Sequence, residues 1–217
     1  MSTTRVRARA VTEEDKEQRR EAILVAAKEV FAASGYHATT MADVARAARI
    51  SYGSVYWYFD SKDALFHALM DSEEQALRRH IDTALAGLDS DTGSEDAFRV
   101  SVRATFEFFE DDRDVVKLLF RDALVLGEPF DRHLAGIYEG FVAEIEQTIE
   151  GAQAAGRVVE APARMIAFSV AALISQLALR RLATDDGLPA SVVADFVVTM
   201  LFDGLRSRSG SRRKTTR

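Results

Sequence analysis

Apolar residues recur at three- and four-residue steps along most of the chain, and this spacing is the period of an amphipathic helix. In the first such segment Ile23, Ala27 and Phe31 share one face. Gly35 follows, and glycine readily takes the left-handed conformation that ends helices. The pattern therefore predicts a first helix that stops near Gly35.

Two short helices are predicted next. Thr39 or Thr40 caps the first, and Ser51 caps the second, because a side-chain oxygen at these positions accepts from the first free N–H groups of a helix. The second carries an aromatic run at residues 56–59. We expect Tyr56 and Phe59, three residues apart, to pack inward.

Helical periodicity continues to the end of the chain. A long helix is expected from about Lys62 to Ala86, and a turn-rich segment at residues 87–94 follows it. Further helices are predicted at residues 95–110, 112–126, 129–153, 162–183 and 189–206. Pro129, Pro162 and Pro189 fall in or near the first turns of the last three, where a missing N–H costs nothing. Since no segment has the pattern of a strand, the fold class is all-α.

Charge is distributed unevenly over the 217 residues, although the net charge is only −6. Residues 1–65 hold ten Lys and Arg against nine Asp and Glu, whereas residues 66–205 hold 12 against 25. Residues 206–217 hold six basic residues and no acidic one. The acidic charge therefore belongs to the middle of the chain, and the last segment is strongly basic.

The absence of cysteine excludes disulfides, thiolate metal sites and cysteine nucleophiles. The N-terminal residues form no apolar stretch of the kind found in signal peptides. The longest apolar run, residues 165–179, is shorter than the roughly 20 residues that cross a bilayer. We therefore expect a cytoplasmic protein without a membrane partner, in which this run forms a buried helix.

The block from Thr39 to Lys62, TTMADVARAARISYGSVYWYFDSK, has the dimensions of a helix-turn-helix unit. In such a unit the second helix enters the major groove of DNA. Small and hydrogen-bonding residues at its start, Ser51 to Ser54, suit that role, and Gly53 permits close approach to the duplex. Trp57 and Tyr58 are expected to point at phosphates or bases.

From Arg19 to about Met70 the sequence resembles the TetR family of bacterial transcriptional regulators. The motifs that carry the resemblance are Gly35-Tyr36, Thr39-Thr40, an Ala-rich second helix, Tyr56 followed by Phe59, and Ser61-Lys62. Two departures are Arg49, where the family usually has glycine in the turn, and Tyr52, which is bulkier than the residue often found there. Because of these departures the base preference does not transfer.

The resemblance implies roles for individual residues in a complex with DNA. Phosphate contacts would come from Thr40, from Tyr56, Trp57 or Tyr58, and from Lys62, and base contacts from Tyr52, Gly53 and Ser54. Simpler explanations stay open for several of them. Tyr56 and Phe59 suit a protein core, Lys62 suits a solvated charge, and Thr40 is a helix cap whether or not it meets a phosphate.

We divide the chain into a flexible basic arm (1–18), a helix-turn-helix domain (19–65), a helical effector-binding and dimerisation domain (66–207) and a disordered basic tail (208–217). Five arginines are taken to precede the first helix: Arg5, Arg7, Arg9, Arg19 and Arg20. They suit either a minor-groove arm or a solubilising tail.

The acidic remainder shows no catalytic arrangement, metal-ligand spacing or cofactor motif, so we predict neither an enzyme nor a metal or cofactor site. By resemblance it is a helical ligand-binding and dimerisation domain. The last two predicted helices are more apolar than one buried face requires. We therefore expect a homodimer through these two helices.

A pocket for a small hydrophobic effector is predicted from aromatic residues and a few polar ones. Its candidate lining is Phe106, Phe109, Phe120, Arg121, His133, Tyr138, Phe141, Phe168 and Gln176. Arg121 suits an acidic head group, and Gln176 within an apolar run requires a partner. Phenylalanine at helical spacing is equally typical of an ordinary core.

These observations together predict a ligand-responsive transcriptional regulator, a repressor that a small hydrophobic effector releases from a pseudo-palindromic double-stranded DNA operator. The alternative is a dimeric DNA-binding activator or scaffold without any small-molecule effector.

Overall fold

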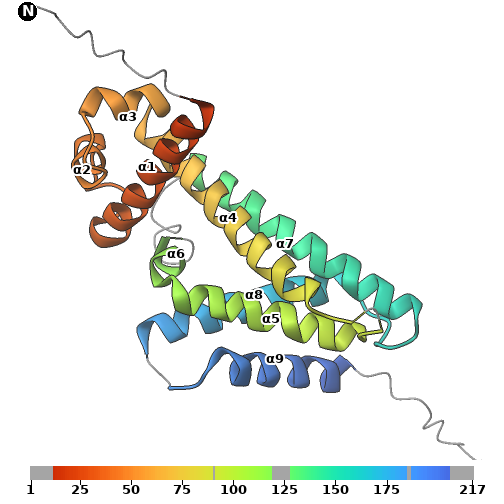
Figure 1. Cartoon of the computed structure of the whole chain (residues 1–217). Helices are drawn as coiled ribbons and strands as arrows, with labels where there is room; N and C mark the ends of the chain where they lie inside the picture. The colour runs from red at the N-terminus through yellow and green to blue at the C-terminus, as the bar shows by residue number, and fades with distance from the viewer. Residues whose placement is uncertain (1–11, 90, 119–127, 185–186, 206–217) are drawn as a thin grey trace, which may run out of the picture. The chain divides into compact units, whose positions relative to one another are not determined.

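The computed structural model describes residues 12–89, 91–118, 128–184 and 187–205, and the regular secondary structure within them is helical (Figure 1). The predicted all-α class is confirmed. The chain divides into two compact units, residues 1–69 and 70–217. Their boundary falls inside one long helix, α4 (Lys62–Ala86).

The first unit contains α1 (Glu13–Ser34), α2 (Met41–Ala47), α3 (Tyr52–Tyr58) and the start of α4. Its core lies where these helices meet. The ring centroid of Phe31 lies 5.4 Å from that of Phe66, which is packed edge-on. Val44 and Val55, from α2 and α3, are completely buried. Each of the two short helices is therefore held by an apolar anchor.

Helix α1 begins earlier than the sequence pattern indicated, which corrects the boundary of the basic arm. The Thr12 hydroxyl accepts from the N–H of Asp15 at 3.1 Å, and the Thr12 N–H donates to the Asp15 carboxylate at 3.0 Å, a reciprocal capping box. Arg19 and Arg20 consequently lie on α1 and do not precede it. The predicted arm residues Arg5, Arg7 and Arg9 lie outside the described residues.

The second unit contains the rest of α4 and five helices: α5 (Ser94–Asp111), α6 (Arg113–Val116), α7 (Glu128–Ala154), α8 (Ala163–Ala183) and α9 (Ala190–Leu205). Helix α5 packs beside α9, and α7 beside α8 (Figure 1). The main apolar cluster joins Leu77 of α4 to Val102 and Phe106 of α5 and to Val197 of α9.

The predicted helix bounds of the second unit are mostly confirmed. Pro162 is the N-cap residue of α8, and Pro189 directly precedes α9. The expected helix at 112–126 differs, because α6 covers only Arg113–Val116 and residues 119–127 lie outside the described part of the chain.

Candidate nucleic-acid interface

Thr40 begins α2 as its N-cap residue. Its hydroxyl accepts from the N–H of Asp43 at 3.2 Å and donates to the Asp43 carboxylate at 2.6 Å. The hydrogen bonds that the Thr40 hydroxyl and then the Thr40 N–H donate to this carboxylate lower the pKa of Asp43. The predicted cap is therefore present. A phosphate contact from the Thr40 hydroxyl stays a prediction. To donate to a phosphate, the hydroxyl would have to give up its hydrogen bond to the Asp43 carboxylate.

The turn between α2 and α3 is a Schellman motif. The N–H of Ile50 donates to the carbonyl of Ala45 at 3.0 Å, and the N–H of Arg49 donates to that of Arg46 at 3.2 Å. Arg49 has a φ of 56°, in the left-handed region that favours glycine. An arginine therefore occupies a backbone position for which glycine is better suited, and its side chain is exposed.

Ser51 caps α3, as predicted: its hydroxyl oxygen accepts from the N–H of Ser54 at 3.1 Å. The inward residues of this helix region are Val55 and Phe59, which are both buried. The expectation that Tyr56 packs inward is wrong, since 38% of Tyr56 is exposed. Val55 and Phe59, four positions apart, anchor the segment, and Tyr56 does not lie on the same face as these two residues.

The outer surface of α3 is aromatic. Tyr52 is 55% exposed and Trp57 is 65% exposed, and nothing lies within 4 Å of the position that a Cβ on Gly53 would take. The rings of Tyr52 and Tyr56 have centroids 4.9 Å apart, and the Tyr52 hydroxyl donates to the Tyr56 hydroxyl at 3.1 Å.

An open groove of about 810 Å³ runs beside this surface. Lys16 and Arg19 of α1 line it, together with Arg49 from the turn and Trp57 and Tyr58 from α3. The Lys16 ammonium lies 5.8 Å from the centre of the Trp57 ring. The groove thus combines cationic and aromatic side chains, the combination that suits a nucleic-acid backbone.

Lys62 has partners within the first unit. Its ammonium donates to the carbonyl oxygens of Tyr36 and Thr39, each at 2.9 Å, and to that of His37 at 3.4 Å. It also lies 4.3 Å from the centre of the Tyr36 ring. These contacts explain a cation at the start of a helix without any phosphate. A phosphate contact from Lys62 stays a prediction, and it competes with three internal acceptors.

The predicted effector residues that the structure describes lie in different parts of the second unit. Phe106 and Phe109 are buried in the main cluster of the second unit, and Phe141 packs against that cluster. Tyr138 pairs with Phe168, with ring centroids 6.1 Å apart, but Phe168 is exposed.

The remaining polar candidates also lie elsewhere. Gln176 is exposed in the single chain, and the expectation that it has a backbone, subunit or ligand partner stays a prediction. The Nε2 atom of His133 lies 2.9 Å from the Asp71 carboxylate. Phe120 and Arg121 lie outside the described side chains.

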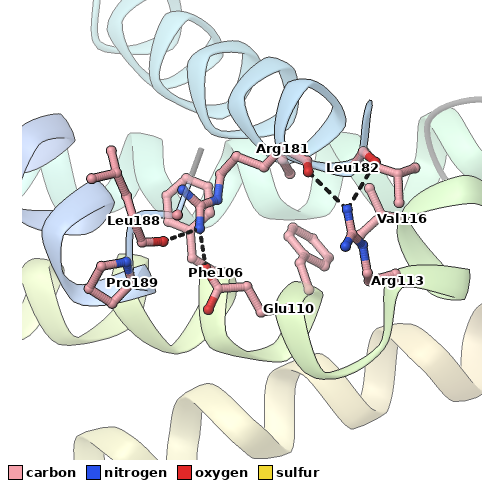
Figure 2. A pocket seen from close by; sticks show the side chains of 11 residues that line it. Phe106, Glu110, Arg113, Val116, Arg181, Leu182, Leu188 and Pro189 are labelled. Atoms are coloured by element: carbon pink, nitrogen blue, oxygen red, sulfur yellow. Dashed lines mark hydrogen bonds and ion pairs between the residues drawn. The ribbon is translucent and has the colours of Figure 1, made fainter. Parts of the chain in front are cut away.

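A cavity of about 380 Å³ lies between α5, α6, the end of α8 and the segment before α9 (Figure 2). Phe106, Phe109 and Ala178 form apolar walls, and Glu110, Arg113 and Arg181 supply charge. None of these three charged residues was among those predicted from the sequence to line a pocket. The sequence feature that could have indicated them is the basic last turn of α8 together with the acidic end of α5.

The charged residues at this cavity tie three elements together. Arg181 donates to the Glu110 carboxylate and to the Leu188 carbonyl, both at 2.5 Å (Figure 2). Arg113 donates to the carbonyls of Arg181 at 3.0 Å and Leu182 at 2.9 Å. Arg113 therefore caps the C-terminus of α8, where free carbonyls and the helix dipole favour a cation.

These features define a helix-turn-helix protein that carries a second, separate helical unit. Residues 23–69 match the family model "Bacterial regulatory proteins, tetR family". The helix-turn-helix unit is therefore similar to that of the TetR family of transcriptional regulators.

One relative is the HTH-type transcriptional activator FasR of Mycolicibacterium smegmatis, 34% identical over 114 residues. The match covers 51% of this chain and 49% of FasR, so the chain spans about half the length of this relative. The relatives found are regulators, and no catalytic family is indicated.

Solved structures share the fold over most of the chain. FadR from Bacillus subtilis, in complex with stearoyl-CoA, has a TM-score of 0.74 at 17% identity and covers 86% of this chain and 99% of its own. AibR, in complex with isovaleryl coenzyme A and operator DNA, has a TM-score of 0.67 at 21% identity and covers 85% and 98%. At these identities the likeness concerns the fold.

Proposed function

We propose that this protein is a dimeric transcriptional regulator of the bacterial cytoplasm, which binds operator DNA through α3 and responds to a small effector. The observation that carries the proposal is the orientation of α3. Val55 and Phe59 anchor its inner side, while Tyr52, Gly53 and Trp57 face outward beside the cationic groove. An exposed short helix with a free glycine at its start fits a major groove.

The experiment begins with selection of bound sequences from random duplex DNA and then uses Gly53→Ala. Alanine in place of a helical glycine raises the free energy of unfolding by up to about 1 kcal/mol, and no protein atom obstructs the new methyl group. In the complex the methyl group meets the duplex, so we expect at least about tenfold weaker binding, or about 1.4 kcal/mol.

Gly151→Ala, in α7 of the second unit, is the matched control, because nothing lies within 4 Å of its Cβ position either. It should stabilise the protein and leave DNA affinity unchanged. A Gly53→Ala variant that is more stable and binds DNA as tightly as the unsubstituted protein would contradict the assignment of α3. Failure to select any sequence would contradict DNA binding itself.

Dimerisation is supported by the apolar surface of α8. This 21-residue helix is long and apolar enough to cross a membrane by length and composition, and only 22% of its most apolar part is buried within the chain. The expectation that residues 165–179 form a buried helix is therefore wrong for the single chain. Exposed apolar residues continue on α9, at Val192, Phe196 and Met200. With only 16 residues, α9 is shorter than the roughly 20 that span a bilayer. We therefore propose that a second copy of this chain covers both helices.

A two-fold dimer presents two recognition helices about 34–36 Å apart and requires a pseudo-palindromic operator. An effector releases DNA only by favouring a conformation in which the two recognition helices are spaced differently. It can shift the equilibrium between the two conformations only by its difference in binding free energy for them. We propose that it acts in this way and that the protein is a repressor.

The effector we propose is a molecule with a hydrophobic chain and an anionic head, such as an acyl thioester of coenzyme A. The cavity lined by Phe106, Phe109, Arg113 and Arg181 is near the lower limit of ligand-pocket volumes. The ligands in the FadR and AibR structures support this chemical class. Thermal unfolding with a series of acyl-CoA compounds tests it, because a ligand at 100 times its Kd adds about 2.7 kcal/mol.

Activation is the second candidate function, since FasR is named as an activator. A reporter gene behind the selected operator, measured with and without this protein, distinguishes the two. Higher expression with the protein present would favour the activator.

A further inference from the structure

The recognition helix of this protein lacks the side chains that read bases by paired hydrogen bonds. Helix α3 has the sequence YGSVYWY, with no Arg, Lys, Asn, Gln, Asp or Glu. Bidentate contacts with guanine or adenine come from Arg, Lys, Asn and Gln, and acceptance from cytosine comes from Glu or Asp. Direct base recognition by α3 must therefore use other chemistry.

The hydroxyl groups at the start of α3 are largely occupied by one another. The Ser51 and Ser54 hydroxyl oxygens are 2.7 Å apart, and Ser51 also accepts from the Ser54 N–H at 3.1 Å. The Tyr52 hydroxyl donates to that of Tyr56 at 3.1 Å. At the start of the helix, the largest apolar surface left exposed is the aromatic carbon of Tyr52, which is more than half exposed.

The major groove offers one apolar group, the 5-methyl group of thymine. We propose that the ring of Tyr52 packs against thymine methyl groups in each operator half-site and that this contact sets the sequence preference of α3. The ring pair with Tyr56, at 4.9 Å between centroids, holds the Tyr52 ring in a fixed position. Gly53 beside it lets the backbone approach the duplex. This inference rests on the proposed function and specifies the chemistry of its DNA site.

The test uses the selected operator with each thymine replaced in turn by deoxyuridine, which removes only the methyl group and keeps the pairing edge. Loss of one buried methyl group corresponds to about 0.8 kcal/mol, or about a fourfold weaker Kd. Changing symmetric positions in both half-sites should weaken binding roughly 16-fold, because distant sites add. All affinities are measured at one salt concentration, since phosphate contacts depend on salt.

Variants of Tyr52 assign the effect to its ring. In Tyr52→Ala the deoxyuridine and thymine operators should bind within about twofold of each other, although both bind more weakly. Tyr52→Phe keeps the ring and should keep the fourfold difference. Trp57→Ala should also keep it, because the proposed contact belongs to Tyr52.

A selected operator that binds equally well with deoxyuridine at every half-site position would overturn the inference while leaving DNA binding intact. A methyl effect that persists in Tyr52→Ala would also overturn it. If no sequence is selected at all, the proposed function and this inference both fail.

Discussion

Both units of the protein expose large apolar side chains, but of different kinds. On α3 of the first unit these are Tyr52, Tyr56 and Trp57, and each carries a polar atom. On α8 and α9 of the second unit they are Met165, Phe168, Val192, Phe196 and Met200, and no member carries a hydrogen-bonding donor.

This difference indicates two kinds of partner. Tyr and Trp have an apolar ring that can pack against a partner and a polar O–H or N–H group that can stay hydrated. This combination suits a hydrated, charged surface such as DNA. Phe, Met and Val gain most when water is fully excluded, as at the core of a permanent protein interface. The composition of the exposed patches thus distinguishes the proposed DNA-facing surface from the proposed subunit-facing surface.

The largest effect is expected from a substitution in the proposed subunit-facing surface of α8 and α9. In Phe196→Glu a carboxylate replaces a ring that is 61% exposed in the single chain and buried in the proposed dimer. At about 2 kcal/mol per copy, and two copies per interface, the dimer Kd should rise roughly a thousandfold. Sedimentation velocity should show a folded monomer.

Val25→Glu is the matched control, because Val25 is an exposed apolar residue of α1 in the first unit. It should leave the dimer unchanged. A Phe196→Glu variant with the sedimentation coefficient of the unsubstituted protein would contradict the contrast between the two surfaces.

The second prediction concerns Lys62. Lys62→Met keeps the aliphatic stem and removes the ammonium that serves carbonyls of the α1–α2 connection. We expect a loss of about 2 kcal/mol in the free energy of unfolding, measured by denaturant titration at fixed protein concentration.

Lys16→Met is the control. Lys16 forms an ion pair with Glu13 on the surface, which is worth less than about 1 kcal/mol. If Lys62→Met instead leaves stability intact and weakens operator binding, the ammonium serves a phosphate.

Alkaline pH offers a third test within the first unit. Burial, and then the hydrogen bond that the Tyr36 hydroxyl donates to Asp63, raise the pKa of Tyr36 above its ordinary value. A raised pKa in the folded state stabilises the protein fully below about pH 10, and this stabilisation is lost as the pH rises further, by at most about 1.4 kcal/mol per pH unit.

Tyr36→Phe removes this ionisation, so its free energy of unfolding should fall less steeply above about pH 10 than that of the unsubstituted protein. Parallel curves for the two proteins would show that the Tyr36 proton does not couple to folding.

The smallest effect is expected from a substitution in the turn between α2 and α3. Arg49→Gly relieves a non-glycine residue at a φ of 56° and should stabilise the protein by about 1 kcal/mol. Arg46→Gly, three residues earlier in α2, should destabilise it by a similar amount, because glycine is unfavourable in a helix. The same sign for both substitutions would contradict the assigned turn.

Arg49→Gly also reports on DNA binding. If the Arg49 guanidinium meets a phosphate, the slope of log affinity against log salt should fall by about 0.9 per site.

Local features were the most predictable. Thr40 and Ser51 cap their helices as expected, and the turn that carries Arg49 lies where the motif placed it. These features depend on hydrogen bonds between residues three to five positions apart, so their sequence signals are short and direct.

Orientation within α3 was less predictable. Seven residues make barely two turns, and a three-residue step (56 and 59) and a four-residue step (55 and 59) both describe an inward face. Packing of α3 against α2 goes with burial of Val55, and Tyr56 is left on the surface.

By itself the sequence determined that the chain is helical, where most of its helices start and end, and that a helix-turn-helix lies near the N-terminus. Only the tertiary structure decided that Lys62 serves carbonyls 23 to 26 positions away, and that Glu110, Arg113 and Arg181 meet at one cavity. The physical reason is range: caps and turns depend on neighbours along the chain, whereas burial and charge partners depend on which helices pack together.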